Sequence, residues 1–349
     1  MSTNFPYNKL NRSAAEEKIR EEKFNRLTLS FYRYIKIDNP QKVRDDLFFK
    51  WESWSILGRI YIAKEGINAQ LCVPEHFFED FKTHLNNYSA FKNIPFKIAI
   101  EEPKVAFYKL TIKVKKQIVA DGLLENEYDV SNIGRHLSAK EWNNAMENGA
   151  IVVDMRNHYE SEIGHFENAV CPEAETFREE LPMVKNLLKG KEEEKVLLYC
   201  TGGIRCEKAS SYLKHFGFKD VNQLHGGIIN YAHQIENNQD LENKFLGKNF
   251  VFDDRLSERI SDDVISNCHQ CGKPCDDHVN CKNLQCNLLF IQCTECREKY
   301  SGCCTPKCID IINIPEEEQK KYRAGKENKK MYHSHKKVDL RKSFDNESR

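Results

Sequence analysis

Tyr199-Cys200-Thr201-Gly202-Gly203-Ile204-Arg205-Cys206 decides the fold of this chain, because it places a cysteine in a glycine-rich turn between a strand and a helix. The apolar run Lys195 to Tyr199 before it is typical of a β-strand. From about Cys206 to Phe216, apolar residues recur at helical spacing. In such a turn the backbone N–H groups converge on the Cys200 sulfur, and the helix dipole and Arg205 add positive charge. The turn therefore predicts a reactive thiolate at Cys200.

A buried structural cysteine is the alternative, since free cysteines are among the most buried residues. A buried thiol needs neither glycines nor a cation, whereas an anion cradle needs close backbone approach and a positive charge at its rim. We therefore assign Cys200 and Arg205 as catalytic, with Arg205 stabilising charge and orienting substrate. Cys206 is either a resolving thiol or a structural residue. The predicted active-site loop also contains Thr201, Gly202, Gly203, Ile204 and Cys206.

Segments on both sides of the Cys200 loop carry further motifs: Ile151 to Glu160, Gly164 to Phe166 and Asn168 to Val170 before it, and Val221 to Ile228 after it. These segments resemble the opening and the closing of a rhodanese domain. The order strand, loop, helix, strand over roughly 110 residues implies a doubly wound parallel sheet with helices on both faces. Cys200 then lies at the carboxyl end of a central strand, where open α/β sheets bind ligands.

The length of the loop distinguishes two chemistries on this fold. Rhodanese-like sulfurtransferases have four residues between the cysteine and the arginine, whereas the related phosphatases have five and a wider cradle. Thr201 to Ile204 are four residues, which disfavours a tetrahedral phosphate and favours a persulfide sulfur or another small species on Cys200. For Asp154, Arg156 and Glu160 we expect strand-end capping and a local ion pair rather than direct chemistry.

Four motifs extend the resemblance to most of the chain: Ala63 to Ala69, Gly134 to Leu137 with Trp142, the Cys200 loop, and Cys268 to Gly272. Over about residues 24 to 308 they resemble the bacterial rhodanese-domain tRNA uridine hydroxylases, which act at the wobble position. The resemblance implies an oxidoreductase that hydroxylates uridine at C5, with tRNA as partner, molecular oxygen as co-substrate and Cys200 as the essential residue. The sequence contains no flavin, haem or nicotinamide signal, so we assign no cofactor for oxygen activation.

Two hypotheses describe the chemistry. The Cys200 thiolate adds to C6 of uridine and makes C5 nucleophilic toward oxygen, or Cys200 is itself oxidised and passes oxygen on. We prefer the first, because it uses ordinary nucleophilic activation. Two other functions stay open: a sulfurtransferase that carries a persulfide on Cys200, for tRNA thiolation or general sulfur relay, and a noncatalytic RNA-binding scaffold, against which Cys200 and Arg205 argue.

Length and composition indicate a multidomain protein. The chain has 349 residues, which is too long for one ordinary core. It contains no apolar run long enough to span a membrane, and Met1 to Arg12 lack an apolar signal segment. We therefore expect a cytoplasmic protein without membrane contact, of open oligomeric state. Thiols stay reduced in the cytoplasm, so the 14 cysteines are candidate ligands or reactive groups.

Charge is unevenly distributed, although the net charge is zero. Residues 26 to 120 hold 16 Lys plus Arg against 10 Asp plus Glu, a net charge of +6, and residues 121 to 267 hold 16 against 27, a net charge of −11. The segment Tyr108 to Lys116 alternates, which predicts a strand with Leu110, Ile112 and Val114 buried and a cationic outer face. The lysines either protect an edge strand from aggregation or contact the phosphates of RNA. The family resemblance described above favours contacts to RNA. The RNA-binding candidates are Lys109, Lys113, Lys115 and Lys116.

The pattern of residues 26 to 120 predicts the element order βαββαβ of a ferredoxin-like or acylphosphatase-like domain. Such sheets often bind RNA on an open face. The expected elements are a strand from Leu27 to Ile37, a helix from Pro40 to Trp54, a hairpin of Gly58 to Ala63 and Ile67 to Val73, a helix from Pro74 to Leu85 and a strand from Phe96 to Ile100.

Ten cysteines lie between Cys268 and Cys308. The pairs Cys268/Cys271 and Cys293/Cys296 have the spacing that lets two thiolates hold a tetrahedral metal, as in a zinc ribbon. We prefer structural zinc, because a small unit with little apolar core needs a bound metal to stabilise its fold. An iron–sulfur cluster is the alternative. A second site would draw on residues whose pairing the sequence does not fix: Cys275, Cys281, Cys286, Cys303, Cys304 and Cys308, with His269 and His278 nearby.

Together these observations predict an α/β protein. It has an N-terminal ferredoxin/acylphosphatase-like α+β domain, a central rhodanese-like doubly wound parallel sheet and a small cysteine-rich C-terminal unit. The expected segments are an N-terminal extension (1–25), a ferredoxin-like RNA-binding domain (26–120), a linker (121–145), a rhodanese domain (146–250), a cysteine-rich unit expected to bind zinc (251–310) and a charged, disordered tail (311–349).

Overall fold

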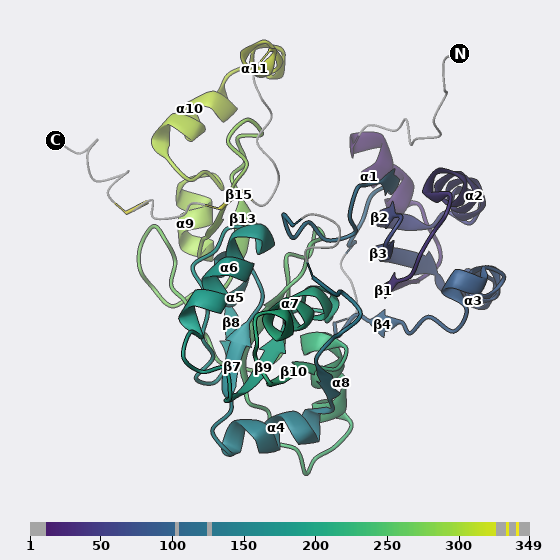
Figure 1. Ribbon diagram of the computed structural model, residues 1–349. Coiled ribbons are helices and arrows are strands. Elements are labelled where there is room, and N and C mark those ends of the chain that lie inside the picture. Colours follow the sequence, from purple (N-terminus) through teal and green to yellow (C-terminus); the bar gives the residue numbers. More distant parts are fainter. Residues whose placement is uncertain (1–11, 102–104, 124–127, 326–332, 335–339, 342–349) are drawn as a thin grey trace.

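A computed structural model describes residues 12–101, 105–123, 128–325, 333–334 and 340–341 of the chain. These residues form three units (Figure 1). In Figure 1 the first unit, in purple and blue, lies to the right of the central unit, in teal. The cysteine-rich unit, in yellow-green, lies at the upper left. Residues 1–11 of the expected N-terminal extension lie outside the described residues.

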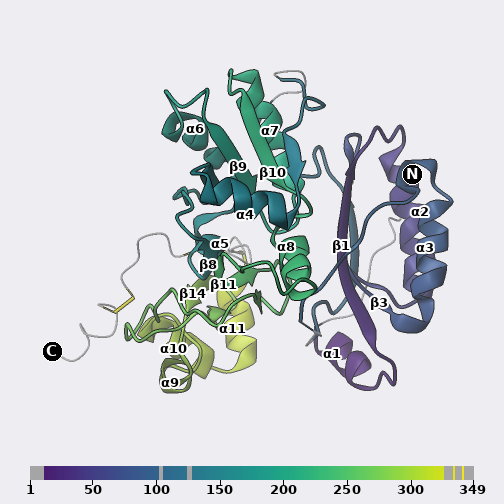
Figure 2. The same ribbon diagram turned by 90° about the horizontal axis from the view of Figure 1, so that it is seen from below.

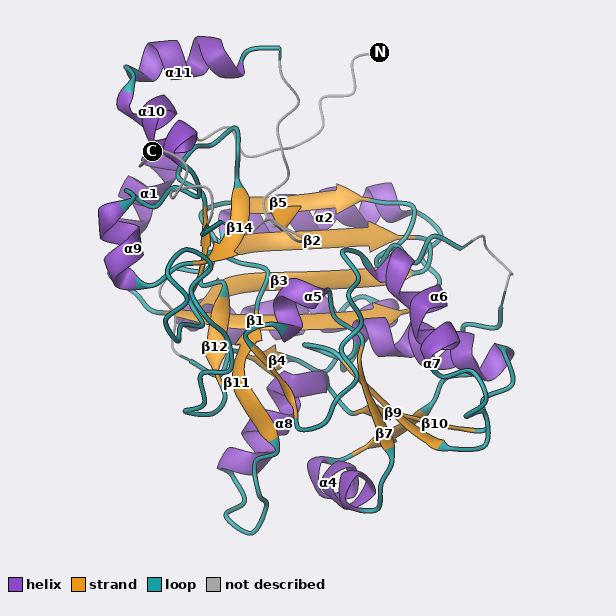
Figure 3. Cartoon of the chain, turned by 90° about the vertical axis from the view of Figure 1, so that its left-hand side faces the viewer, coloured by secondary structure: helices purple, strands orange, loops and turns teal. Residues whose placement is uncertain are grey.

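The first unit has the predicted acylphosphatase-like order βαββαβ. Its elements are β1 (Arg26–Tyr34), α2 (Pro40–Ser53), β2 (Leu57–Ala63), β3 (Gly66–Pro74), α3 (Phe78–Asn86) and β4 (Lys97–Ile98), with 3₁₀ turns at Glu75–Phe77 and Ser89–Phe91. Helix α1 (Arg12–Arg20) precedes them and β5 (Leu110–Val114) follows them. The sheet order is β4-β1-β3-β2-β5 (Figure 3), in which β5 runs parallel to β2 and the other neighbours are antiparallel.

The two faces of this sheet differ, because successive side chains of a strand point to opposite sides. One face is apolar and packs against α2 and α3 through buried residues such as Phe31, Ile62 and Leu71. Figure 2 shows α2 and α3 on one side of β1 and β3, and the other units on the opposite side. The second, polar face of the sheet is therefore turned toward the rest of the molecule.

The lysine-rich strand β5 is shorter than the predicted segment Tyr108 to Lys116, and its burial differs at one position. Leu110 and Ile112 are buried as expected, but Val114 is 39% exposed. Val114 ends a strand that lies at the edge of the sheet order, where the described strands give it a neighbour on one side only. The expectation that Val114 is buried is therefore wrong, because the end of an edge strand receives little cover.

The central unit contains the predicted parallel sheet, in the order β6-β10-β9-β7. Apolar clusters pack on both faces, one with α6 and α7 and the other with α4 and α8. The elements are β6 (Arg135–Leu137), α4 (Ala139–Glu147), β7 (Ile151–Asp154), α5 (His158–Ser161), β8 (Gly164–Phe166), α6 (Phe177–Leu187), β9 (Lys195–Tyr199), α7 (Ile204–His215), β10 (Asp220–Leu224) and α8 (Gly227–Glu236). The expected linker at 121–145 is corrected, because β6 pairs with β10 and α4 belongs to the same unit.

A small antiparallel sheet connects the central unit to the cysteine-rich unit. It has the order β12-β11-β8 and contains β11 (Phe245–Phe250) and β12 (Ser257–Arg259). The cysteine-rich unit then contributes β13 (His278–Asn280), β14 (Leu288–Ile291), α9 (Thr294–Lys299), α10 (Pro306–Asn313), α11 (Glu316–Arg323) and β15 (His333–Ser334).

The expected disordered tail at 311–349 is also corrected in its first part. Helix α10 extends to Asn313, and α11 follows directly with three glutamates in its first turn and basic residues in its last. That charge order complements the helix dipole and supports a helix of little apolar content. Residues 326–332, 335–339 and 342–349 lie outside the described residues. Among the described helices, none combines the length and the apolar character needed to cross a membrane.

Candidate active site and metal centres

Cys200 follows β9 directly, ahead of the turn that begins α7, and it is fully buried. The backbone N–H of Gly203 donates to its Sγ at 3.2 Å. Burial alone would raise the pKa of Cys200, but the hydrogen bond from Cys206, the charge of Arg205 and backbone N–H groups outweigh burial and lower that pKa to about 6. The thiol is therefore largely ionised at neutral pH, as a nucleophilic cysteine requires.

Two glycines allow the backbone geometry of this loop. Gly203 has a φ of +94°, which lets the chain turn into α7. Gly227 has a φ of +68°, and a Cβ placed on it would lie 2.5 Å from the carbonyl oxygen of Cys200. Because Gly227 permits this approach, Ile228 N–H donates to that oxygen at 3.1 Å and Ile229 N–H donates to the Thr201 carbonyl at 3.2 Å. The backbone at the start of α8 thus fixes the loop through two hydrogen bonds.

Arg205 is held by a buried carboxylate. Its two terminal nitrogens donate to the two carboxylate oxygens of Glu160 at 2.6 and 2.9 Å. Glu160 is fully buried and also accepts the backbone N–H of Asn157 in a capping box. Of the two roles predicted for Arg205, stabilising the charge of Cys200 fits this pairing. Glu160 accepts one N–H from each terminal nitrogen, so the guanidinium keeps further donors for a substrate.

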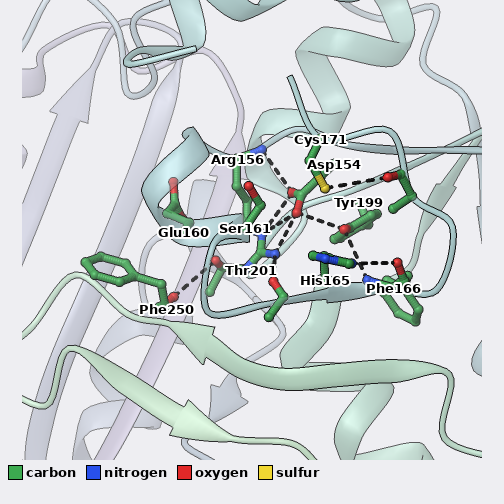
Figure 4. Close-up of polar contacts among 12 residues, drawn as sticks. Asp154, Arg156, Glu160, Ser161, His165, Phe166, Cys171, Tyr199, Thr201 and Phe250 are labelled. Carbon is green, nitrogen blue, oxygen red and sulfur yellow. Dashed lines mark hydrogen bonds and ion pairs between the residues drawn. The ribbon is translucent and has the colours of Figure 1, made fainter. Parts of the chain in front are cut away.

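A second buried ion pair lies at the end of the strand that leads into the loop (Figure 4). The Arg156 guanidinium donates to Asp154 at 2.6 to 3.1 Å, and the Tyr199 hydroxyl donates to the same carboxylate at 2.8 Å. Asp154 and Arg156 are fully buried. They form the local ion pair that the sequence predicts, whereas Glu160 pairs with Arg205 instead. Since Tyr199 directly precedes Cys200, this network fixes the end of β9.

A cavity of about 1340 Å³ lies between the first unit and the Cys200 loop. One wall is the loop, including Cys200, Gly202 and Arg205. The opposite wall is the open face of the first sheet. Parts of the segment 251–258 and of the cysteine-rich unit complete the lining. The cleft therefore joins the reactive thiol to a polar surface from another unit.

The open face contributes two cross-strand rows to this wall. One row is Tyr32, Asn68 and Tyr61, and the other is Lys97, Ser30, Gln70 and Arg59. Gln70 donates to the Asn68 side-chain oxygen at 2.5 Å, and Asn68 donates to the Ile118 carbonyl at 3.4 Å. Reasoning from the sequence missed these residues. Their signal was the alternation of polar and apolar residues along β1, β2 and β3.

The predicted RNA-binding lysines lie beside this wall. Lys113 is paired in register with Tyr61, and the Lys115 ammonium lies 5.5 Å from the Tyr61 ring centroid. Lys109 and Lys116 flank the strand, and all four lysines are exposed. The open face thus continues from the cavity to a cationic edge.

The cysteine-rich unit brings eight of its ten cysteines into two groups of four. In each group the sulfurs lie within 4.8 Å of one another, and Cys275 and Cys303 belong to neither group. The groups are Cys268, Cys271, Cys293 and Cys296, and Cys281, Cys286, Cys304 and Cys308.

The donor set of both groups fits zinc. Four thiolates around zinc at about 2.3 Å are separated by about 3.8 Å. The sulfur–sulfur distances are 3.6 Å for Cys271–Cys293 in the first group and 3.5 Å for Cys286–Cys304 in the second. Three cysteines of the second group also line the cavity. Each group can close a tetrahedral shell without another ligand.

Comparison with known families matches one model to each unit. Residues 26–118 match the UPF0176 acylphosphatase like domain, residues 138–234 the rhodanese-like domain, and residues 246–309 the rhodanase C-terminal model. A protein from Leptospira interrogans named tRNA uridine(34) hydroxylase is 57% identical over 323 residues, covering 92% of this chain and 88% of the relative. Proteins of the same name from Enterobacter sp. (strain 638) and Pectobacterium carotovorum are 47% and 48% identical over 324 residues, covering 92% of this chain and 93% and 91% of the relatives.

The fold and the site define a rhodanese-fold enzyme with an activated cysteine. An acylphosphatase-like domain precedes the rhodanese domain in the sequence, and a cysteine-rich unit follows it. The identity over most of both chains then gives the family. The chain belongs to the tRNA uridine(34) hydroxylases.

Proposed function

We propose that this protein hydroxylates C5 of the wobble uridine in tRNA with molecular oxygen, using Cys200 as the nucleophile. The observation that carries the proposal is the cleft, in which an activated, buried cysteine faces a polar sheet from a domain of net positive charge. The names of the relatives give hydroxylation of uridine 34 in tRNA. A tRNA substrate places the enzyme in the cytoplasm.

The cleft suits a single nucleotide turned out of its stack. Its volume exceeds that of ordinary small-molecule sites, roughly 300 to 1,000 Å³, so it has room for a base with its ribose and phosphate. Uracil presents carbonyl acceptors and an N–H donor along one edge, which match the side-chain amides of Asn68 and Gln70. Tyr61 offers an aromatic face on which a base can stack. Lys113 and Lys115 then contact the phosphates of the flanking RNA.

Cys200 starts the chemistry by adding to C6 of the uracil ring. Addition of a thiolate to C6 gives C5 the electron density that it needs to react with oxygen. Arg205 keeps Cys200 ionised through its charge, and the loop N–H groups hold the sulfur in place. A zinc ion in each four-cysteine group would supply a structural link, and the closed thiolate shells leave no open coordination position of the kind that catalytic zinc requires.

Mass spectrometry of tRNA nucleosides tests the function. Cells that lack the gene should lose 5-hydroxyuridine derivatives, and the wild-type gene should restore them. Cys200→Ser should fail to restore them while folding normally, because a serine hydroxyl is not ionised at neutral pH. Loss of a thiolated nucleoside would instead establish the sulfurtransferase alternative. If the nucleosides of cells with and without the gene do not differ, the protein is a noncatalytic RNA-binding scaffold instead.

A further inference from the structure

Lys97 reaches the Cys200 loop from the other side of the cleft. Strand β4 pairs Lys97 with Ser30, which puts its side chain on the open face of the first sheet. A Cβ placed on Gly202 would lie 3.5 Å from Cδ and 3.9 Å from Cε of Lys97. The Lys97 ammonium lies 4.4 Å from the centroid of the Tyr32 ring. The Lys97 side chain therefore packs against Gly202 in the loop that contains Cys200.

Tyr32 keeps this lysine in position. Its hydroxyl donates to Glu207 on α7 at 3.0 Å, and a Cβ on Gly203 would lie 2.9 Å from the same hydroxyl oxygen. The face of the ring then supports the Lys97 ammonium by a cation–π contact. Tyr32 thus links the first sheet to α7 by a hydrogen bond, and its ring keeps the Lys97 ammonium in the cleft.

Lys97 differs from the other cations that line the cleft. Arg205 is bound to Glu160, Arg255 is bound to Asp253 and Glu258, and Arg59 donates to the Phe252 carbonyl. Within the part of the chain that the structure describes, Lys97 has neither an ion-pair partner nor a hydrogen-bond acceptor. Its charge is consequently available to a bound molecule.

We propose that Lys97 is a catalytic residue, whose ammonium stabilises the uracil O4 as Cys200 adds to C6. The proposal rests on the function proposed above. In this step the sulfur–C6 bond forms, the C5=C6 π bond breaks, and the electron pair moves through C4 onto O4 as an enolate. Lys97 donates a hydrogen bond to that oxygen. Solvent then protonates the enolate at C5. Loss of the original C5 hydrogen as a proton re-forms the enolate, and expulsion of the Cys200 thiolate restores the C5=C6 bond, so the C5 hydrogen is exchanged with solvent.

Physical chemistry favours a lysine in this place. A preorganised donor in a partly desolvated cleft stabilises developing negative charge more than the same donor in water. Burial lowers the pKa of Lys97 to about 8, with the charges of Cys200 and Glu207 opposing that shift. The Cys200 pKa of about 6 lies below it. Near neutral pH the cleft therefore holds a thiolate and an ammonium together.

Hydrogen exchange at C5 without oxygen tests the proposal. The purified enzyme is incubated anaerobically in D₂O with an anticodon stem-loop RNA that carries uridine at the wobble position, and deuterium at C5 is measured by mass spectrometry. Wild type should exchange the hydrogen. Lys97→Met should slow the exchange by about 100-fold or more, the usual loss for one donor at a developing oxyanion. Lys97→Arg should restore part of the rate, and Lys92→Met, an exposed lysine of the same unit, should match wild type.

The outcomes separate this proposal from the function on which it rests. Exchange at the wild-type rate in Lys97→Met overturns the role of Lys97, even if the wild type forms 5-hydroxyuridine. If wild type exchanges, Lys97→Met exchanges slowly, and wild type forms no 5-hydroxyuridine in air, the proposed function is overturned and the role of Lys97 stays supported. Wild type that hydroxylates without any exchange overturns the addition step. Thermal unfolding of Lys97→Met and Lys97→Arg shows whether a loss of exchange comes from misfolding. If one variant is misfolded, the exchange rate of the other, folded variant tests the role of Lys97.

Discussion

Cys206 donates a hydrogen bond to Cys200 from the first turn of α7 and is as deeply buried as its partner. Replacing it with alanine removes this donor, so Cys206→Ala should raise the pKa of Cys200 above its value of about 6. Cys206→Ser keeps a donor and should be milder. The alkylation rate of Cys200 by iodoacetamide against pH measures both shifts. A midpoint that stays in place in Cys206→Ala would show that the backbone and Arg205 suffice.

The pH dependence of hydroxylation reports on Cys200 and Lys97 together. Thiolate forms as the pH rises through the Cys200 pKa of about 6, so the rate should increase there. The ammonium is lost as the pH rises through the Lys97 pKa of about 8, so the rate should fall there. A single-turnover profile should therefore be bell-shaped. Lys97→Arg should lose the alkaline limb and keep the acid one, and a persistent alkaline limb would assign it to another group.

Strand β5 carries lysines along an edge that is continuous with the cleft. Changing Lys109, Lys113 and Lys115 together to glutamine should weaken tRNA binding and flatten its dependence on salt, since each lost phosphate contact removes about one released counterion. Filter binding at several salt concentrations measures the slope. A triple variant of exposed lysines on the central unit, Lys140, Lys189 and Lys191, is the control. If both variants keep the wild-type slope, the lysines of β5 only guard the edge.

Elements with a local signal were predictable, and those that depend on a distant partner were not. The strand Lys195 to Tyr199 and the order βαββαβ follow from apolar spacing within short windows. Strand β6 is three residues long, and its pairing with β10 about 85 residues later has no local signal. The sequence marks Cys200 as a candidate because its glycines and arginine are neighbours in sequence. It gives no such signal for Lys97, because only the packing of two units brings Lys97 to Cys200.

We expect the two four-cysteine groups, once they bind metal, to give the C-terminal unit much of its order. Replacing Cys268 and Cys271 with serine should release one metal ion per chain and make residues 268–308 sensitive to protease. The central unit has its own apolar clusters and should stay folded. Elemental analysis and limited proteolysis measure both effects. Cys275→Ser is the control, since Cys275 lies outside both groups and should leave the metal content unchanged.

Zinc is the metal that we expect in both four-cysteine groups. Iron with a visible absorption band would contradict that expectation. If hydroxylation were lost as the band bleached, the four-cysteine group that borders the cavity would become the centre that activates oxygen, and a purely structural role for the metal would be wrong.

The placement of Lys97 and Cys200 on opposite walls of one cleft also orders events on the ribosome. An amino-terminal domain emerges first, and synthesis adds roughly 5 to 20 residues per second. Lys97 is added to the chain roughly 5 to 20 s before Cys200, and the first unit has an apolar core of its own, so it can fold first. The loop around Cys200 then folds against a surface that already exists. A nascent chain that stops short of Cys200 carries no activated thiol, and a finished one places its thiolate opposite a lysine that is already in position.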